Sequence, residues 1–299
     1  MLDFIQRRQF LKPLLAAPLA TLGGCTWLVD VNHDGPDAPT AQPLAQRPRT
    51  AWVLSSGGPR GFAHVGVLKA LHEMGQRPDL LVGASIGSLV GSLYAGAMPV
   101  AEIEKLAMEF STMSIVRPHW TSGGEKLSAQ GMVGLVNELL AHRPLERLAI
   151  PTAVVAMEQF SRQLVAFTRG NAGVAIQASC AIEGRLAPVR VRGLSYVDPD
   201  LGAPMPVRMA RALGASRVLA VDVSAHEDKA PAESERYRAG DLRKRALTEP
   251  DARAATLTLH PELDYYVSLS QAFRERMIRA GYEQTLAMAA QIKAAMADG

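Results

Sequence analysis

Two glycine-rich turns carry the residues of this chain whose types and spacing suit covalent chemistry. One of them, Gly83-Ala84-Ser85-Ile86-Gly87, has the spacing G-x-S-x-G between an apolar run and a helical pattern. In that setting the flanking glycines permit a sharp turn that lifts the serine hydroxyl to the start of the helix. Ser85 is therefore a candidate nucleophile for acyl transfer, a reaction that also needs a base and donors for an oxyanion.

The other turn, Gly57-Gly58-Pro59-Arg60-Gly61, follows the apolar run from Trp52 to Ser56. It is not a P-loop, because no Gly-Lys-Ser/Thr closes it, and its glycines do not have the spacing G-x-G-x-x-G. Backbone N–H groups in such a turn are exposed to a negative partner. We therefore predict that this turn supplies donors to the oxyanion that forms when Ser85 attacks an acyl carbon.

Taken together, the two turns resemble those of the patatin-like phospholipases, particularly the bacterial branch related to neuropathy target esterase. The resemblance spans roughly Thr50 to Glu283 in the family's order. It also includes the segments Ala178–Ile182, Tyr196–Asp198, Pro204–Val207 and Ile278–Glu283. The resemblance implies an α/β fold of three layers, in which helices flank a mostly parallel central sheet.

The site that this resemblance implies is a Ser-Asp dyad without histidine, metal or cofactor. Carried over by position, Ser85 is the nucleophile and Asp198 is the base that takes its proton. The oxyanion site falls on four residues of the first turn, Gly57, Gly58, Arg60 and Gly61. The implied activity is hydrolysis of membrane-derived acyl esters, with phospholipid, lysophospholipid and simple esters all open.

The run Asp198-Pro199-Asp200 departs from the family's pattern, which has Asp-Gly-Gly or Asp-Gly-Ala at the base. Because Pro199 fixes its own φ and restricts Asp198, we expect the base carboxylate to point differently. Asp200 is either an ordinary turn residue facing solvent or a like charge that raises the pKa of the base. Glu183 and Ala203 also replace the family's usual proline and asparagine.

Two other functions remain open from these residues. The changed turn at Asp198 would suit a catalytically impaired patatin-fold lipoprotein that acts as an envelope binding module. An α/β-hydrolase with a Ser-His-Asp triad would instead use His226 or His260 as its base, since histidine follows the acid in that fold. The histidines show no H-E-x-x-H spacing for a metal.

Apolar strands that alternate with helices predict the α/β layers. The expected strands are Thr50–Ser56, Leu80–Gly83, Thr152–Met157, Leu164–Thr168 and Arg217–Val223. The expected helices are Gly61–Met74, Ile86–Ala95, Gln130–Ala141 and Val267–Met296, the last with a break near Gly281. The charged segment His226–Arg253 is expected to be an irregular surface excursion.

The N-terminal residues have the pattern of an export signal. Arg7-Arg8-Gln9-Phe10-Leu11-Lys12 resembles a twin-arginine signal, and Leu22-Gly23-Gly24-Cys25 resembles a lipobox whose cysteine receives lipid. We therefore expect a signal at residues 1–24, a Pro/Ala-rich tether at 25–49 and a hydrolase domain at 50–299. The expected location is the periplasmic face of the inner or outer membrane, with Cys25 as the lipidated residue.

The composition agrees with one globular domain behind such a leader. The chain has 299 residues, of which 48% are hydrophobic and 20% charged, and a formal net charge of +3. Much of that charge lies in the leader, so the remainder is nearly neutral and gives no electrostatic case for nucleic acid. If Cys25 carries lipid, Cys180 is left alone and no internal disulfide can form.

Overall fold

The computed structural model describes residues 31–119, 124–225, 228 and 230–297. Its strands are β1 (Asn32–His33), β2 (Thr50–Leu54), β3 (Leu80–Ala84), β4 (Arg117–Pro118), β5 (Leu127–Ser128), β6 (Thr152–Glu158), β7 (Leu164–Phe167), β8 (Val189–Val191), β9 (Leu194–Val197), β10 (Arg217–Val221) and β11 (Leu257–Leu259). Its α-helices are α1 (Phe62–Glu73), α2 (Ile86–Ala95), α3 (Val100–Glu109), α4 (Thr112–Ile115), α5 (Gly131–Leu139), α6 (Ala172–Ser179), α7 (Val207–Ala212), α8 (Glu235–Ala254), α9 (Gln271–Ala287) and α10 (Ala289–Met296).

Within these residues nine strands form one sheet, whose order is β1-β8-β9-β6-β3-β2-β10-β11, with β7 paired to β6. The five strands from β6 to β11 in this order run parallel, whereas β7 and β9 pair with β6 in the antiparallel sense. The predicted strands are confirmed to within two residues at each end. Parallel neighbours bring the carboxyl ends of β2, β3, β6 and β10 to one edge, where ligand sites of α/β sheets lie.

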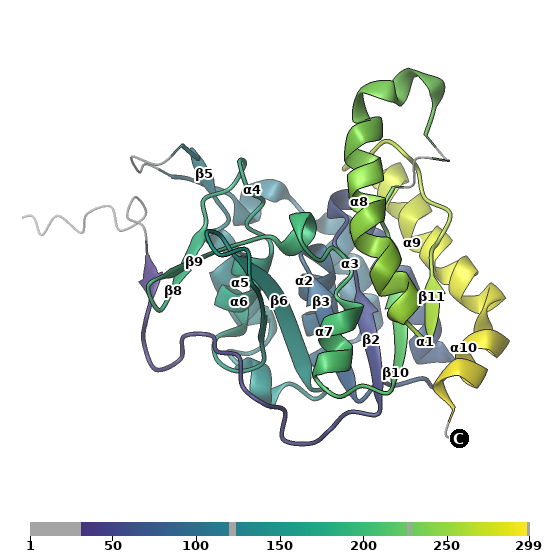
Figure 1. Ribbon diagram of the computed structural model, residues 1–299, viewed down its shortest axis with the longest axis horizontal. Coiled ribbons are helices and arrows are strands. Elements are labelled where there is room, and N and C mark those ends of the chain that lie inside the picture. The colour runs from purple at the N-terminus through teal and green to yellow at the C-terminus, as the bar shows by residue number, and fades with distance from the viewer. Residues whose placement is uncertain (1–30, 120–123, 226–227, 229, 298–299) are drawn as a thin grey trace, which may run out of the picture.

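The sheet is the middle one of three layers (Figure 1). Trp52 and Leu54 of β2 point into one apolar core, which α1, α2, α5, α6 and α9 cover. The alternate residues Ala51 and Val53 point into a second core, which α7 covers together with the end of α8. Since successive side chains of a strand point to opposite faces, a continuous apolar run supplies both cores. The expected three-layer α/β class is confirmed.

The predicted tether at 25–49 is not a free linker in residues 31–49, the part of it that the structure describes. β1 pairs in parallel with β8, and Thr40 forms an isolated bridge with Arg169. Ala38 is buried between these points. Residues 31–49 thus run along the domain and hydrogen-bond to it, a set of long-range contacts that composition does not encode. The signal at 1–24 and Cys25 lie outside the described residues.

The expected excursion at His226–Arg253 is wrong for most of its length, because residues from Glu235 onward form the helix α8. The helix is held at its C-terminal half by Asp251, whose carboxylate accepts hydrogen bonds from the backbone and guanidinium of Arg208 at 2.8–3.2 Å. Asp251 itself is buried. The buried carboxylate of this charged helix is therefore paired with Arg208.

The long terminal helix is confirmed with two corrections. It begins at Gln271, where Ser270 caps it by accepting a hydrogen bond from the Phe273 N–H, and it is interrupted at Met288. Gly281 lies within α9 and permits close helix packing, because a Cβ there would lie 2.1 Å from the Ala63 carbonyl oxygen of α1. In the described part of the chain, no helix combines the length and the hydropathy needed to cross a bilayer.

Candidate active site

Ser85 occupies a strained turn between β3 and α2. Its backbone adopts φ 51° and ψ −126°, a conformation that L-residues rarely take and that is typical of functional turns. A Cβ at Gly83 would lie 2.4 Å from Ser88 Cα, and one at Gly87 would lie 2.3 Å from the Leu54 carbonyl oxygen. The two glycines of the motif are thus required by close backbone contacts as well as by turn geometry.

Two hydroxyls hold this turn in place. The Ser85 N–H donates to Ser179 Oγ at 2.8 Å, and Ser179 Oγ in turn donates to the Val155 carbonyl of β6 at 2.6 Å. Ser88 Oγ donates to the Ser85 carbonyl, also at 2.6 Å. These bonds satisfy the polar groups that the sharp turn removes from the regular ladder, so the turn is fixed before any substrate binds.

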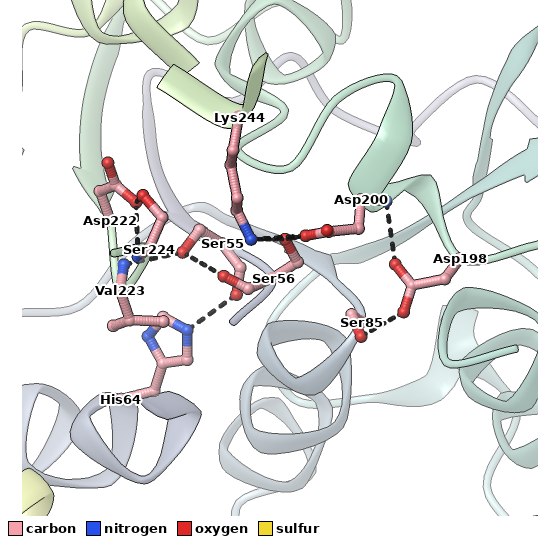
Figure 2. A network of polar contacts seen from close by, with 10 residues as sticks. All are labelled: Ser55, Ser56, His64, Ser85, Asp198, Asp200, Asp222, Val223, Ser224 and Lys244. Carbon is pink, nitrogen blue, oxygen red and sulfur yellow. Dashed lines mark hydrogen bonds and ion pairs between the residues drawn. The ribbon is translucent and has the colours of Figure 1, made fainter. Parts of the chain in front are cut away.

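Asp198 is brought to Ser85 by the register of the sheet. Ala84 of β3 pairs with Val155 of β6, while Val197 of β9 pairs with Met157 in the antiparallel sense. One residue further along each strand, Ser85 and Asp198 reach the level of Ala156 from opposite sides of β6. There Ser85 Oγ donates to Asp198 Oδ2 at 2.5 Å (Figure 2).

The environment of Asp198 shifts its acidity strongly. The side chain is buried, and burial together with the neighbouring charge of Asp200 raises the pKa of Asp198 to about 7. The hydrogen bond from Ser85, the Asp200 N–H bond to Oδ1 at 2.9 Å and the charge of Lys244 act in the opposite direction. A carboxyl group that titrates near neutral pH suits a general base, because it is both available and sufficiently basic.

Pro199 does not turn the carboxylate away, contrary to the expectation from its sequence. Asp198 adopts φ −56° and ψ 130°, an extended geometry that a following proline favours. Pro199 then opens the 3₁₀ turn η4 (Pro199–Leu201), in a position where its missing N–H is not needed. The Asp-Pro-Asp run therefore builds a turn that still directs Asp198 at Ser85.

Asp200 is held in an ion pair, unlike an ordinary turn residue that faces solvent. Its Oδ1 contacts Lys244 Nζ of α8 at 2.6 Å and accepts a hydrogen bond from the Ser56 hydroxyl at the end of β2. Burial opposes ionisation of this carboxyl, but the Lys244 charge and the two hydrogen bonds outweigh it and lower the pKa of Asp200. A like charge therefore stands beside Asp198, as one of the two expectations had it.

The turn Gly57–Gly61 lies against the Ser85 elbow. A Cβ on Gly61 would lie 2.4 Å from the Ile86 side chain, directly after Ser85, and one on Gly57 would lie 2.6 Å from Val223 Cγ2 after β10. Gly58 has φ +54°. Gly61 of the predicted oxyanion turn is thus packed against the residue that follows Ser85, and side chains at Gly57 or Gly61 would not fit there.

Only the backbone of Arg60 belongs to this turn. Its guanidinium donates to the Asp264 carbonyl at 3.1 Å and to the Tyr265 carbonyl, on the segment that precedes α9. We infer that the arginine of the motif fixes the turn by fastening this segment across it.

His64 and His260 take structural positions. His64 is fully buried, and its Nε2 lies 2.9 Å from the Ser55 carbonyl oxygen; burial lowers the pKa of His64 to about 4. The His260 Nε2 lies 3.1 Å from the Ser224 carbonyl oxygen, beyond β10 (Ser224 is drawn in Figure 2). His226 lies outside the described residues. Among the residues that are described, no cluster of His, Cys, Asp or Glu is arranged to hold a metal.

Sequence reasoning missed three residues of this site. Ser56 and Lys244 hold Asp200, and Ser179 holds the Ser85 backbone. Ser179 lies inside a segment that resembles the family, so position alone could have found it. Lys244 gave no such signal, because it comes from a charged stretch far along the chain. Cys180 is buried, and burial together with Asp198 raises its pKa.

Comparison with known proteins agrees with this site. The sequence model of the family described as patatin-like phospholipase matches residues 52–211, more than half of the chain, so the protein belongs to that family. The resemblance inferred from the two glycine turns is thereby confirmed. Membership supports lipid ester hydrolysis as the class of reaction.

Individual relatives share the matched region. An NTE family protein of Mycobacterium tuberculosis is 33% identical over 183 residues, which cover 60% of this chain and 50% of that protein. The human patatin-like phospholipase domain-containing protein 6 is 29% identical over 60% of this chain and 14% of its own length. The lysophospholipase NTE1 of Mycosarcoma maydis is 32% identical over 60% and 10%, respectively. This chain therefore spans half or less of these relatives.

Among solved structures, VipD from Legionella pneumophila aligns with a TM-score of 0.49 at 14% identity, covering 87% of this chain and 71% of that one.

Proposed function

We propose that this protein is a serine hydrolase that cleaves lipid acyl esters through a dyad of Ser85 and Asp198. The observation that carries the proposal is the 2.5 Å hydrogen bond from Ser85 Oγ to a buried Asp198 carboxyl whose pKa is raised to about 7. That pair can remove the hydroxyl proton as Oγ attacks, and the base is oriented by the Asp200 N–H, which donates to Oδ1.

The reaction proceeds in two halves. Asp198 takes the Ser85 proton while Oγ bonds to the ester carbonyl carbon, and the oxyanion is stabilised by backbone N–H groups of the turn Gly57–Gly61. Protonated Asp198 then gives its proton to the leaving alkoxide as the carbon–oxygen bond breaks and an acyl-enzyme remains. Water attacks the acyl carbon with Asp198 again acting as base, and Asp198 returns that proton to Ser85 Oγ as the bond from the acyl carbon to Oγ breaks and the fatty acid is released.

The substrates are membrane-derived acyl esters, with phospholipids and lysophospholipids as the first candidates. The name of the fungal relative supports a lysophospholipid among them. We further propose that the chain is exported and anchored through lipid on Cys25 at the periplasmic face of a bacterial membrane, on the strength of the two N-terminal motifs. Such an anchor would place the site beside its substrate.

The test uses purified protein with p-nitrophenyl butyrate, lysophosphatidylcholine and a fluorophosphonate probe. Wild type should hydrolyse an ester and bind the probe, whereas Ser85→Ala should do neither and Asp198→Asn should be slower by orders of magnitude. His260→Ala should remain within a few-fold of wild type. A large loss in His260→Ala, with native circular dichroism, would favour the triad of an α/β-hydrolase. Wild-type protein inert to all three reagents would favour the binding-module alternative.

A further inference from the structure

Lys244 connects a helix outside the matched family region to the base of the dyad. Its Nζ lies 2.6 Å from Asp200 Oδ1 and 3.3 Å from Ser56 Oγ, and only 20% of its side chain is exposed. Figure 2 shows it reaching from α8 toward Asp200 and Ser56. The family model ends at residue 211, so α8 and Lys244 belong to the part of the chain that the match does not cover.

The contact between Lys244 and Asp200 affects the base because Asp200 is only two residues from Asp198 in the chain. The turn η4 carries the Asp200 N–H that donates to Asp198 Oδ1 at 2.9 Å, so the position of Asp200 determines the orientation of Asp198. Ser56, two residues after β2, holds the same turn through its hydroxyl to Asp200, and its N–H donates to the Pro204 carbonyl beyond that turn at 2.8 Å. Lys244 is the cation among these contacts.

The charge of Asp200 also has to be compensated. A partly buried carboxylate without a partner is strongly unfavourable, and as a like charge it would disfavour ionisation of Asp198. The family's turn has glycine or alanine at this position and carries no such charge. Asp200 and Lys244 of α8 therefore form an ion pair in which each side chain compensates the charge of the other.

We propose that Lys244 is a positioning residue for the reaction: by binding Asp200 and Ser56 it fixes the turn that directs Asp198 at Ser85, and it offsets the Asp200 charge so that the base is available near neutral pH. The proposal rests on the dyad function proposed above. It assigns α8 a role in the chemistry, which that function does not need by itself.

Burial and its neighbours determine the charge state of Asp198. The Ser85 hydroxyl and the Asp200 N–H donate to its carboxylate, and the Cys180 thiol at the end of α6 is a further titratable group near it. Asp200 on its own turn disfavours the ionised form, whereas Lys244 on α8 favours it. Because the two charged neighbours act with opposite signs, removing them one at a time should move the acidic limb of the rate profile in opposite directions.

The experiment measures kcat/KM for p-nitrophenyl butyrate from about pH 5 to 9, where the acidic limb reports the base of the free enzyme. A charge within about 4–6 Å moves a carboxyl pKa by one to three units. Lys244 contacts Asp200 and not Asp198 itself, so its effect on Asp198 should be at the lower end of that range. We therefore expect the acidic limb to move upward by about one pH unit in Lys244→Met. Activity should fall about tenfold on the acidic side and recover at high pH. Asp200→Asn should move the limb downward.

Two further variants and a control complete the design. Lys244→Arg keeps the charge and should keep the limb near its wild-type position. The double variant Asp200→Asn with Lys244→Met removes both charges and should also lie near wild type. Arg243→Met makes the same type of change at the neighbouring, exposed position of α8 and should leave the profile unchanged.

The outcomes separate this proposal from the dyad itself. An active wild type whose acidic limb does not move in Lys244→Met, or moves upward in Asp200→Asn, would overturn the role of Lys244 and leave the dyad standing. Wild-type protein without esterase activity would overturn both. If Lys244→Met does not fold, as judged by near-UV circular dichroism, the opposite-sign comparison still rests on Asp200→Asn, Lys244→Arg and the double variant.

Discussion

Replacing Asp198 by asparagine should stabilise the folded protein at neutral and alkaline pH while it abolishes rapid catalysis. The carboxyl is buried, and its pKa in the folded state is raised from 3.8 to about 7. Between these two pH values the folded chain binds a proton that the unfolded chain has already lost. The contribution of Asp198 to stability is therefore full at low pH and is lost as the pH rises through about 7. Asparagine, which does not titrate, escapes that loss.

The magnitude follows from the width of this window. Each pH unit of difference between the two states corresponds to about 1.4 kcal/mol, so roughly three units give about 4 kcal/mol above pH 7. That value is an upper estimate, because the amide replaces the short hydrogen bond to Ser85 by a weaker one. For a domain of this size about 2 °C of Tm corresponds to each kcal/mol, which gives a gain of up to about 8 °C.

The assay is thermal unfolding followed by circular dichroism, in steps from about pH 4 to 8.5, with wild type and variant compared at each pH. The difference in Tm should be small near the acidic end and grow until it levels off above pH 7. Asp79→Asn is the matched control with the opposite sign. Burial opposes ionisation of Asp79, but hydrogen bonds from the Thr50 N–H, the Thr50 hydroxyl and the Arg49 N–H outweigh it and lower its pKa. That variant should lose stability above pH 4.

A Tm difference for Asp198→Asn that does not depend on pH would refute the reasoning, because it would mean that the carboxyl titrates alike in both states. A variant less stable than wild type at pH 8 would refute it as well. It would show that the Ser85 and Asp200 hydrogen bonds outweigh the cost of burying the charge.

The remaining predictions concern a buried histidine and the export motifs. Burial lowers the pKa of His64 from 6.5 to about 4, so the contribution of His64 to stability should fall by about 3 kcal/mol as the pH falls through that range, while the contribution of Asp198 rises. His64→Gln should therefore gain stability relative to wild type on acidification in chemical unfolding titrations, and an unchanged acid dependence would contradict it. Cys25→Ser should release the protein from the membrane fraction, and protein that stays in washed membranes would count against lipidation. Replacing Arg7 and Arg8 by lysine should block export, so unchanged periplasmic yield would argue against a twin-arginine signal.

The parts of the fold that sequence predicted are those with local causes. The strands around Val53 and Leu219 are continuous apolar runs, since both faces of the sheet are covered, and the run is visible without knowing its neighbours. The turn at Ser85 was equally visible, because close backbone contacts there exclude any residue but glycine at positions 83 and 87. The five consecutive residues Gly83–Gly87 were therefore sufficient to predict the candidate nucleophile.

The parts that sequence missed depend on partners far along the chain. Lys244 and Asp200 are 44 positions apart, and neither pattern nor charge spacing joins them. The sequence of α8 predicts an irregular segment because it is rich in charged residues. The ion pair of Asp251 with Arg208, which helps to hold the helix, joins residues 43 positions apart and leaves no local pattern. Pro199 misled for the opposite reason, since a rule about local backbone strain was applied to a turn whose geometry the proline in fact favours.

The candidate site and its surroundings also contain several groups that the fold holds in an unfavourable conformation or environment. Ser85 holds a strained backbone, Asp198 is buried in a form that resists ionisation, and His64 is buried where it resists protonation. Between about pH 4 and 6.5 these two groups change the free energy of unfolding with pH in opposite directions. The folded state keeps Asp198 protonated, whereas it keeps His64 neutral. Their contributions largely cancel in wild type, so a flat stability profile there would not mean that neither group is strained. Each slope becomes visible only when the other group is replaced, and for that reason the stability of single variants across pH reports on this site more directly than the stability of the native chain.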